Sequence, residues 1–371
     1  MDSGNPGRLL RLVAMQNRSF SKAGRRLVRP LLLALALLAG IMLANPAGFG
    51  GDESLAAAPG EELPVTATPL PLNRNDPGQD RIGSLRFMGA VHLRSSHAGF
   101  GGISGLRAGP DGRFLAITDT GNWLAFRTLE QQGRLVGIRE VHMRPLRMAD
   151  GKPAPDKQTG DAEALEWDPA SGDASVVFEQ DHRIVHWKGV DPQRLDTLDN
   201  PAWRTERMPL MADWPANGGG EAMVRWRAPD GAAARLVIAE DVVQDNGDRL
   251  ALFTHGGQTR TVGIAGVEEH KPTDAVMVDA NRMLVLHRRF NLKGAGAAIS
   301  LLDLAPLFAD PPGRRLPARL LAQWQAPVLL DNMEGLAVVR EGERLFVYVV
   351  SDDNLLSLQK TLLMKFALDL P

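Results

Sequence analysis

A repeated pair of short apolar segments is the feature that most restricts the fold of this chain. In each copy a polar or acidic residue precedes an apolar segment, a turn rich in Asp, Gly or Asn follows, and a second apolar segment ends in charged residues. The C-terminal copy runs from Asp331 to Asn354. Two apolar segments joined by a polar turn are typical of a β-hairpin, and the antiparallel return brings both polar ends to the same end of it.

Five copies of this pair follow one another at nearly constant spacing. When one residue near the start of each copy is taken as a marker, the separations are 59, 58, 53 and 60 residues. Each interval holds two further strand-like segments, such as 123–128 and 134–141. Four strands per repeat of this length are typical of a β-propeller blade. The markers are Ser104, Glu163, Glu221, Asp274 and Glu334.

We therefore predict an all-β protein that folds as a five-bladed β-propeller. Six blades are the alternative, because the irregular interval 187–215 is long enough to hide one. Segment 82–93 has strand character and precedes the first repeat, whereas the last repeat ends the chain after three strands, the third at 361–368. We expect the N-terminal strand to complete the last blade, because closing the ring removes exposed strand edges.

The N-terminal region differs in composition from the repeats. Residues 1–47 carry a basic segment followed by an apolar run at 31–44, which predicts an export signal. The run is short for a membrane span, and an uncleaved N-terminal anchor is the alternative. Residues 48–82 are rich in Gly, Ala and Pro and are predicted to be a linker, and 83–371 form the propeller domain. We expect a periplasmic or secreted protein, or one anchored in the inner membrane and facing the periplasm.

Charge and cysteine content exclude several classes of function. The formal net charge of −2 argues against a nucleic-acid binder that depends on a global positive field. The absence of Cys excludes thiol nucleophiles, iron–sulfur clusters and Cys-based zinc sites. The expected partner is a small anionic substrate, and the only membrane contact expected is through an uncleaved N-terminal segment.

Carboxylates gather where the hairpins would meet the axis of the ring. The innermost strands of a propeller line its central channel, so residues at their starts surround one mouth of that channel. Carboxylates brought so close together must bind a cation, pair with a base or take up protons. Oxygen-only ligands favour a hard cation, which makes Ca²⁺ the expected cofactor. The alternative is that the carboxylates accept hydrogen bonds from the backbone and pair with Arg. The predicted metal ligands are Glu163, Glu221, Glu334, Asp119, Glu179, Glu240 and Asp352.

Basic residues lie at the same ends of the hairpins. Arg183, Arg288 and Lys360 are predicted to hold an anionic substrate, since guanidinium groups match phosphate and carboxylate geometry. The alternative is that they neutralise the acidic ring. His182 and His287 are the candidate acid–base catalysts in these loops.

Several motifs resemble those of the phytase-like family, exported bacterial proteins described as having esterase-like activity. They are found at 101–106, 117–121, 161–165, 217–222 and 331–336. The resemblance implies a propeller and a phosphoester hydrolase activity. By position it carries over Ser104, placed with the substrate-binding residues, and Asp119, Glu163, Glu221 and Glu334. The unit around Asp274 is the weakest match.

Two functions therefore follow from the sequence. The first is an exported, metal-dependent phosphoester hydrolase with esterase-like activity. The alternative is a non-catalytic periplasmic propeller that binds a ligand or a protein. A lactonase-type hydrolase is disfavoured, because it would require a tighter Asn, Asp and Glu metal set than the sequence offers.

Overall fold

The structure, a computed structural model, describes residues 61–370. The chain divides into two units, Met1–Ala47 and Gly48–Pro371, and the described residues all belong to the second. The predicted export signal or anchor at 1–47 therefore lies outside the described residues. Among the described residues, no helix has both the length and the apolar character needed to span a bilayer.

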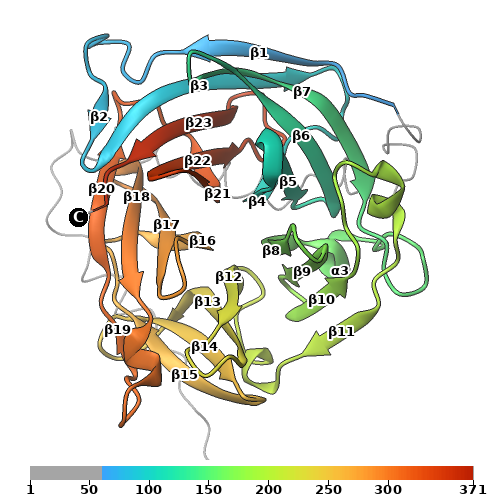
Figure 1. Cartoon of the computed structure of the whole chain (residues 1–371), viewed down its shortest axis with the longest axis vertical. Helices are drawn as coiled ribbons and strands as arrows, with labels where there is room; N and C mark the ends of the chain where they lie inside the picture. Colours follow the sequence, from blue (N-terminus) through green and yellow to red (C-terminus); the bar gives the residue numbers. More distant parts are fainter. Residues whose placement is uncertain (1–60, 371) are drawn as a thin grey trace, which may run out of the picture. The chain divides into compact units, whose positions relative to one another are not determined.

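Five small, mainly antiparallel sheets surround a common centre and form a five-bladed β-propeller, which confirms the predicted fold (Figure 1). From the centre outward, the first blade consists of β4 (Ile103–Ala108), β5 (Arg113–Thr118), β6 (Asn122–Gln131) and β7 (Arg134–Pro145). The second consists of β8 (Ala162–Asp168), β9 (Asp173–Phe178), β10 (Arg183–Trp187) and β11 (Arg204–Arg207). The third consists of β12 (Gly220–Arg227), β13 (Ala233–Val243), β14 (Arg249–His255), β15 (Gln258–Ile264) and β19 (Arg315–Leu316).

The last two blades follow the same plan. The fourth blade consists of β16 (Lys271–Met277), β17 (Arg282–Asn291), β18 (Gly294–Asp303) and β20 (Arg319–Gln325). The fifth consists of β21 (Asn332–Glu341), β22 (Arg344–Asp352), β23 (Thr361–Leu368), β3 (Leu85–Ser95) and β1 (Val65–Leu70), with β2 (Arg81–Ile82) paired to β3. The helical segments are short: α3 (Lys157–Gly160), η2 (Pro110–Gly112), η3 (Leu195–Asp199), η4 (Pro209–Met211) and η5 (Ala305–Phe308). The irregular interval 187–215 holds η3, β11 and η4 and contributes no sixth sheet.

The ring is closed by the N-terminal strand, as predicted. β3 pairs antiparallel with β23, from Leu93 opposite Thr361 to Leu85 opposite Leu368. Figure 1 shows the two strands, from opposite ends of the described chain, side by side.

Part of the predicted linker belongs to the propeller. Val65–Leu70, inside the range 48–82, forms β1 and pairs with β3 as the outermost strand of the fifth blade. The segment lacks the alternation of large apolar residues that marks a strand, and it contains Pro69. An outer strand tolerates Pro because one of its edges makes no ladder hydrogen bonds.

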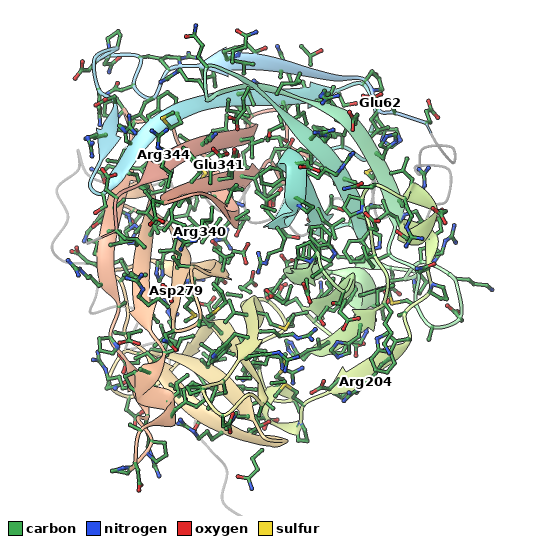
Figure 2. The ribbon with its side chains drawn as sticks, viewed as in Figure 1. Glu62, Arg204, Asp279, Arg340, Glu341 and Arg344 are labelled. Carbon is green, nitrogen blue, oxygen red and sulfur yellow. The ribbon has the colours of Figure 1, made fainter. Side chains whose placement is uncertain are left out.

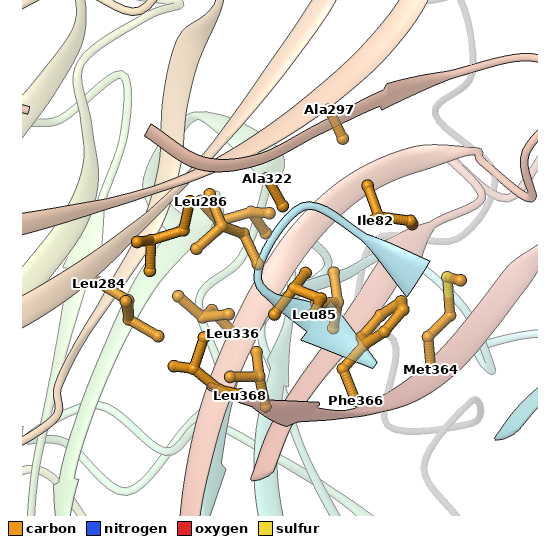
Figure 3. Packing of buried hydrophobic residues seen from close by; sticks show 14 of the residues in the cluster. Ile82, Leu85, Leu284, Leu286, Ala297, Ala322, Leu336, Met364, Phe366 and Leu368 are labelled. Carbon is orange, nitrogen blue, oxygen red and sulfur yellow. The ribbon is translucent and has the colours of Figure 1, made fainter. Parts of the chain in front are cut away.

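Each pair of neighbouring blades encloses one hydrophobic cluster, so the core is divided into five parts. The cluster between the fourth and fifth blades includes Leu284 and Leu286 on one side and Leu336 and Phe366 on the other (Figure 3). The second strand of a blade is buried on both faces, as Leu115, Ala116 and Ile117 of β5 illustrate. This packing fixes the inner strands β4, β8, β12, β16 and β21 around the axis.

Candidate metal centre

The five inner strands start with the same distortion, a β-bulge. The register between the first and second strands of each blade shifts by one residue at the start of the inner strand, which leaves one residue unpaired. Such a bulge re-aims a side chain that would otherwise face a neighbouring blade. The bulged residues are Ser104, Glu163, Glu221, Thr273 and Glu334.

The fourth bulged residue is therefore Thr273, whereas the sequence pattern predicts Asp274 as the equivalent position. The bulge lies between Pro272 and Asp274, and Asp274 pairs regularly with Leu286. Two adjacent polar residues make the sequence register ambiguous by one position. Asp274 instead forms an ion pair with Arg107, which lies deeper in the central channel than the bulged residues.

The two hydroxyl residues at bulged positions connect neighbouring blades. The Ser104 hydroxyl donates to the Ala162 carbonyl oxygen at 2.6 Å, and the Thr273 hydroxyl donates to the Met333 carbonyl oxygen at 3.0 Å. In both cases the acceptor precedes the bulged Glu of the next blade. Ser104 is buried and its hydroxyl is engaged, so the predicted substrate-binding role gains no direct support.

The second strands carry a second ring of charged residues at the same end of the hairpins. In each blade, the residue before the bulge pairs with a residue of the second strand, and the next residue along the chain belongs to this ring. The five residues are Asp119, Glu179, Glu240, Arg288 and Asp352. Four of the five are the predicted carboxylates, and the fourth blade supplies a guanidinium. Arg288 pairs with Glu240 at 2.8 Å and with Glu334 at 3.1 Å, so it neutralises part of the ring.

The predicted carboxylates therefore converge. Burial, followed by the charge of neighbouring carboxylates, raises the pKa of Glu163, Glu221 and Asp352 well above the usual range. The same causes raise the pKa of Glu334 to about 7, although Arg288 opposes the shift. We call the set Asp119, Asp161, Glu163, Glu179, Glu221, Glu240, Glu334 and Asp352 the carboxylate mouth.

Three members of the mouth are arranged so that they could hold a metal ion. One ligand oxygen from each of Asp161, Glu163 and Glu179 lies within 4.8 Å of the other two. That separation is about twice a Ca²⁺–oxygen bond length, so one ion can reach all three. Among the described residues, the Glu163 carboxylate makes no hydrogen bond or ion pair. Glu179 is oriented by the backbone N–H groups of Gly218 and Gly219, the latter at 2.7 Å.

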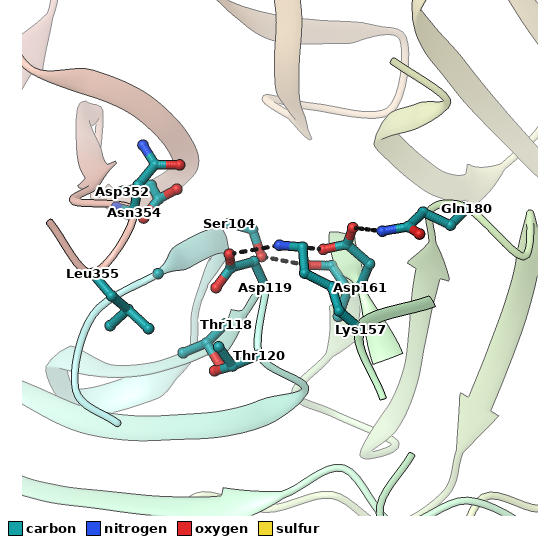
Figure 4. A network of polar contacts seen from close by, with 12 residues as sticks. Ser104, Thr118, Asp119, Thr120, Lys157, Asp161, Gln180, Asp352, Asn354 and Leu355 are labelled. Atoms are coloured by element: carbon teal, nitrogen blue, oxygen red, sulfur yellow. Dashed lines mark hydrogen bonds and ion pairs between the residues drawn. The ribbon is translucent and has the colours of Figure 1, made fainter. Parts of the chain in front are cut away.

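Asp161 was not among the predicted ligands. It is held by Lys157 of α3 at 3.1 Å and by the Gln180 side chain at 2.7 Å (Figure 4). Lys157 also pairs with Asp119 at 3.2 Å, and its own pKa is raised by these two carboxylates in spite of burial. Asp161 stands two residues before Glu163 in the sequence, which is the signal that could have identified it.

The donor set fits a hard cation. Every candidate ligand is a carboxylate oxygen, and Ca²⁺ prefers six to eight oxygen ligands. The nearby cations Lys157, Lys271 and Arg288 pair with Asp119, Asp161, Glu240 and Glu334. Glu163 and Glu221 have no basic partner within ion-pairing distance among the described residues, so a bound cation would be needed to keep them ionised against the rise in their pKa.

Arg107 of β4 closes the central channel beneath the mouth. Its guanidinium pairs with Asp274 at 2.9 Å and with Glu166 at 3.3 Å. It also donates to the carbonyl oxygens of Met223, Ala275 and Leu336 at 3.1, 2.8 and 3.2 Å. One side chain thus contacts the inner strands of the other four blades. The carboxylate mouth is consequently a depression that is closed at its base by Arg107 and its polar partners. We call this depression the cup and Arg107 its floor.

The remaining predicted basic residues have partners outside the carboxylate mouth. Arg183 pairs with Asp181 at 2.6 Å, and its guanidinium lies 4.4 Å from the centre of the Phe178 ring. The Lys360 backbone N–H donates to Asp331 at 3.1 Å. The His182 ring is buried, and its Nε2 donates to the Trp214 carbonyl oxygen at 3.0 Å.

His287 is buried in the fourth blade, where its Nε2 lies 2.7 Å from the Ser300 hydroxyl. Burial lowers the pKa of His287 to about 3, so the ring is neutral at pH 7. A role for either imidazole as an acid–base catalyst stays a prediction.

The lowered pKa of His287 predicts a dependence of stability on pH. The unfolded chain binds a proton at this ring below the ordinary histidine pKa of 6.5, whereas the folded chain does so only near a pKa of about 3. Stability from this group is therefore complete above 6.5 and is lost as the pH falls, by up to about 1.4 kcal/mol per pH unit. We expect His287→Gln to flatten this loss in urea unfolding at acidic pH. His97→Gln, which alters a partly exposed ring, should not, and equal slopes for both variants would contradict the assignment.

Comparison with known proteins identifies the family of the chain. The family model described as "Phytase-like: Esterase-like activity of phytase" matches residues 98–355. The chain belongs to the phytase-like family. Its matched segment starts just before β4 and ends just after β22, so it contains every residue of the carboxylate mouth.

Similarity to other known proteins is distant. No curated protein matches the chain. Solved structures with a related arrangement include U3-55K, at 9% identity and a TM-score of 0.36, covering 76% of this chain and 98% of that one. The catalytic domain of a GH62 α-L-arabinofuranosidase from Coprinopsis cinerea matches at 13% identity and a TM-score of 0.42, covering 82% of this chain and 97% of that one. Such distant likenesses carry no conclusion about this protein's function.

Proposed function

We propose that this phytase-like propeller binds Ca²⁺ in the carboxylate mouth and hydrolyses a phosphoester there. The observation that carries the proposal is the meeting of Asp161, Glu163 and Glu179 in a cup where carboxylates outnumber cations. Family membership supports the same class of reaction. We further propose that the protein is exported, on the strength of its basic and apolar N-terminal segment.

We assign the following roles in ion and substrate binding to residues in and around the carboxylate mouth. Asp161, Glu163, Glu179 and Glu221 hold the ion, and the Gly218 and Gly219 N–H groups keep Glu179 oriented. Bound Ca²⁺ would polarise a phosphoryl oxygen and lower the pKa of a coordinated water. Arg288 and Lys157 offset the negative field of the mouth, which lowers the cost of bringing an anionic substrate close to it. Arg183 and Lys360 would add further positive charge around the carboxylate mouth.

One observation favours the alternative, a propeller that binds without catalysis. The hydroxyl and guanidinium groups predicted to contact substrate are engaged within the protein, Ser104 by Ala162 and Arg288 by Glu240 and Glu334. A protein that binds its ligand without catalysis would need the bound ion and the cup, but no free catalytic or substrate-contacting groups. The two functions share the metal site and differ in turnover.

A phosphatase and esterase assay with and without chelator tests the proposal. We expect the purified protein to hydrolyse a nitrophenyl phosphate in Ca²⁺ and to lose activity in EDTA. The double variant Glu163→Gln, Glu334→Gln should lose about 100-fold or more, a size typical of removing electrostatic stabilisation.

The matched control is Glu341→Gln, which changes an exposed residue at the far end of the same strand as Glu334. It should retain full activity. Absence of turnover together with Ca²⁺-dependent melting would favour the binding protein. Metal-independent turnover by the double variant would contradict a metal-dependent hydrolase site in the carboxylate mouth.

A further inference from the structure

The interface between the second and third blades changes character along its length. Near the mouth it is apolar, with Val177 and Ile184 facing Val237 and Leu252. Two residues further from the mouth, both blades present rows of polar side chains joined by strand pairing. These rows are Glu166, Ser175, His186 and Arg204 in the second blade, and Arg225, Arg235, Thr254 and Thr259 in the third.

The neighbouring interface shows that this polarity is not a requirement of the fold. Between the third and fourth blades the opposite face of the same strand, β12, packs Val224 and Trp226 in a cluster with Met283 and Leu302. A polar interface between blades therefore needs another explanation.

Seven of these eight residues, all except Glu166, line a cavity of about 450 Å³. Its walls include Ser175, His186 and Trp203 from the second blade and its outer loop, and Arg225 and Arg235 from the third. Arg204, labelled beside β11 in Figure 2, also lines it. The lining residues of β9 come from its start, whereas Glu179 of the mouth follows its end, so the cavity lies toward the opposite face of the propeller.

The cavity carries one exposed guanidinium, that of Arg225, which makes no ion pair with a described residue, although Glu166 lies close enough to interact with it electrostatically. Arg225 and Arg235 are directly opposite each other on β12 and β13, a like-charge arrangement that is destabilising on its own. Glu206 compensates Arg235 through two hydrogen bonds, at 3.0 and 2.6 Å. Arg225 only donates to the Ser175 hydroxyl at 3.1 Å, and it makes no ion pair with any described residue.

An exposed aromatic ring lies in the same cavity. Trp203 is 53% exposed, which is unusual for so large an apolar side chain. The Lys188 ammonium lies 4.2 Å from the centre of its ring. One wall of the cavity thus offers a flat apolar surface and another offers an exposed guanidinium without an ion-pair partner among the described residues.

We propose that this cavity is a second binding site, which takes a small organic anion that combines a carboxylate with a flat ring. The carboxylate pairs with Arg225, whose planar fork suits two parallel hydrogen bonds. The ring lies on Trp203. The site needs no metal and is independent of the carboxylate mouth.

Ligand titration of the purified protein in the presence of EDTA tests this site separately from the mouth. Benzoate is the probe, with acetate and inorganic phosphate as comparisons, and binding is followed by calorimetry and by Trp fluorescence. We expect benzoate to bind more tightly than acetate or phosphate. Its affinity should fall about tenfold or more in Arg225→Gln and in Trp203→Leu.

Arg227→Gln is the matched control, because Arg227 is exposed on the same strand two residues further on, outside the cavity lining. It should bind benzoate like the wild type, and thermal melting checks that all variants are folded. Absence of benzoate binding to the wild type, or equal affinities of Arg225→Gln and Arg227→Gln, would overturn the site. Tighter binding of phosphate than of benzoate would overturn the assigned ligand class.

Discussion

Replacing Arg107 with Met is expected to lower the free energy of unfolding by about 3–5 kcal/mol, the usual cost of removing one partner from a buried ion pair. Arg107 is 4% exposed, and the change leaves Asp274, which is fully buried, without its cation. The carbonyl oxygens of Met223, Ala275 and Leu336 lose a donor as well. Urea unfolding followed by circular dichroism measures the effect.

Two further variants separate the role of the charge from a general loss of packing. Arg344→Met removes an exposed Arg on β22 and should change stability by less than about 0.5 kcal/mol. Adding Asp274→Asn and Glu166→Gln to Arg107→Met removes the unpaired negative charges and should recover a large part of the loss. If Arg107→Met were as stable as Arg344→Met, the Arg107 guanidinium would not be the group that holds the inner strands together beneath the carboxylate mouth.

Replacing Glu163 with Gln is expected to remove most of the stabilisation that Ca²⁺ gives the wild type. A ligand present at 100 times its dissociation constant stabilises the folded state by about 2.7 kcal/mol. Glu163 has a ligand oxygen in the triad and no competing partner, so its loss should abolish most of the rise in Tm on adding Ca²⁺. Thermal melting with and without millimolar Ca²⁺ measures this difference.

The same experiment has an internal control and a pH arm. Glu341→Gln should show the full Ca²⁺ shift, and a full shift in Glu163→Gln would contradict the assignment of the triad. The folded-state pKa values of Glu163, Glu221 and Asp352 are raised, so without metal these groups destabilise the fold as pH rises through those values. Ca²⁺ displaces the protons, so its stabilising effect should grow over the same rise.

Much of the architecture could be predicted from the sequence because a propeller repeats one local pattern. The spacing of the hairpins determined the blade number, and the missing fourth strand of the last repeat indicated closure by β3. Seven of the eight carboxylates of the mouth, all except Asp161, were predictable for the same reason, since equivalent positions in successive blades lie around one axis.

The features that were missed depend on geometry that no single repeat contains. The bulge at Thr273 shifts the pattern by one residue, which sequence similarity could not distinguish from Asp274. Arg107 looks like an ordinary strand residue, and only ring closure brings four other blades within its reach. The position of Arg288 among the carboxylates follows from pairing in the fourth blade, so its role as a neutralising group was one of two open interpretations.

Direct measurement of bound Ca²⁺ tests the central claim, that the carboxylate mouth is a cation site. Equilibrium dialysis of the wild type at neutral pH should show saturable binding of at least one Ca²⁺ per chain, released by chelator and lost in Glu163→Gln. Retention of no Ca²⁺ at millimolar free concentration would contradict the claim.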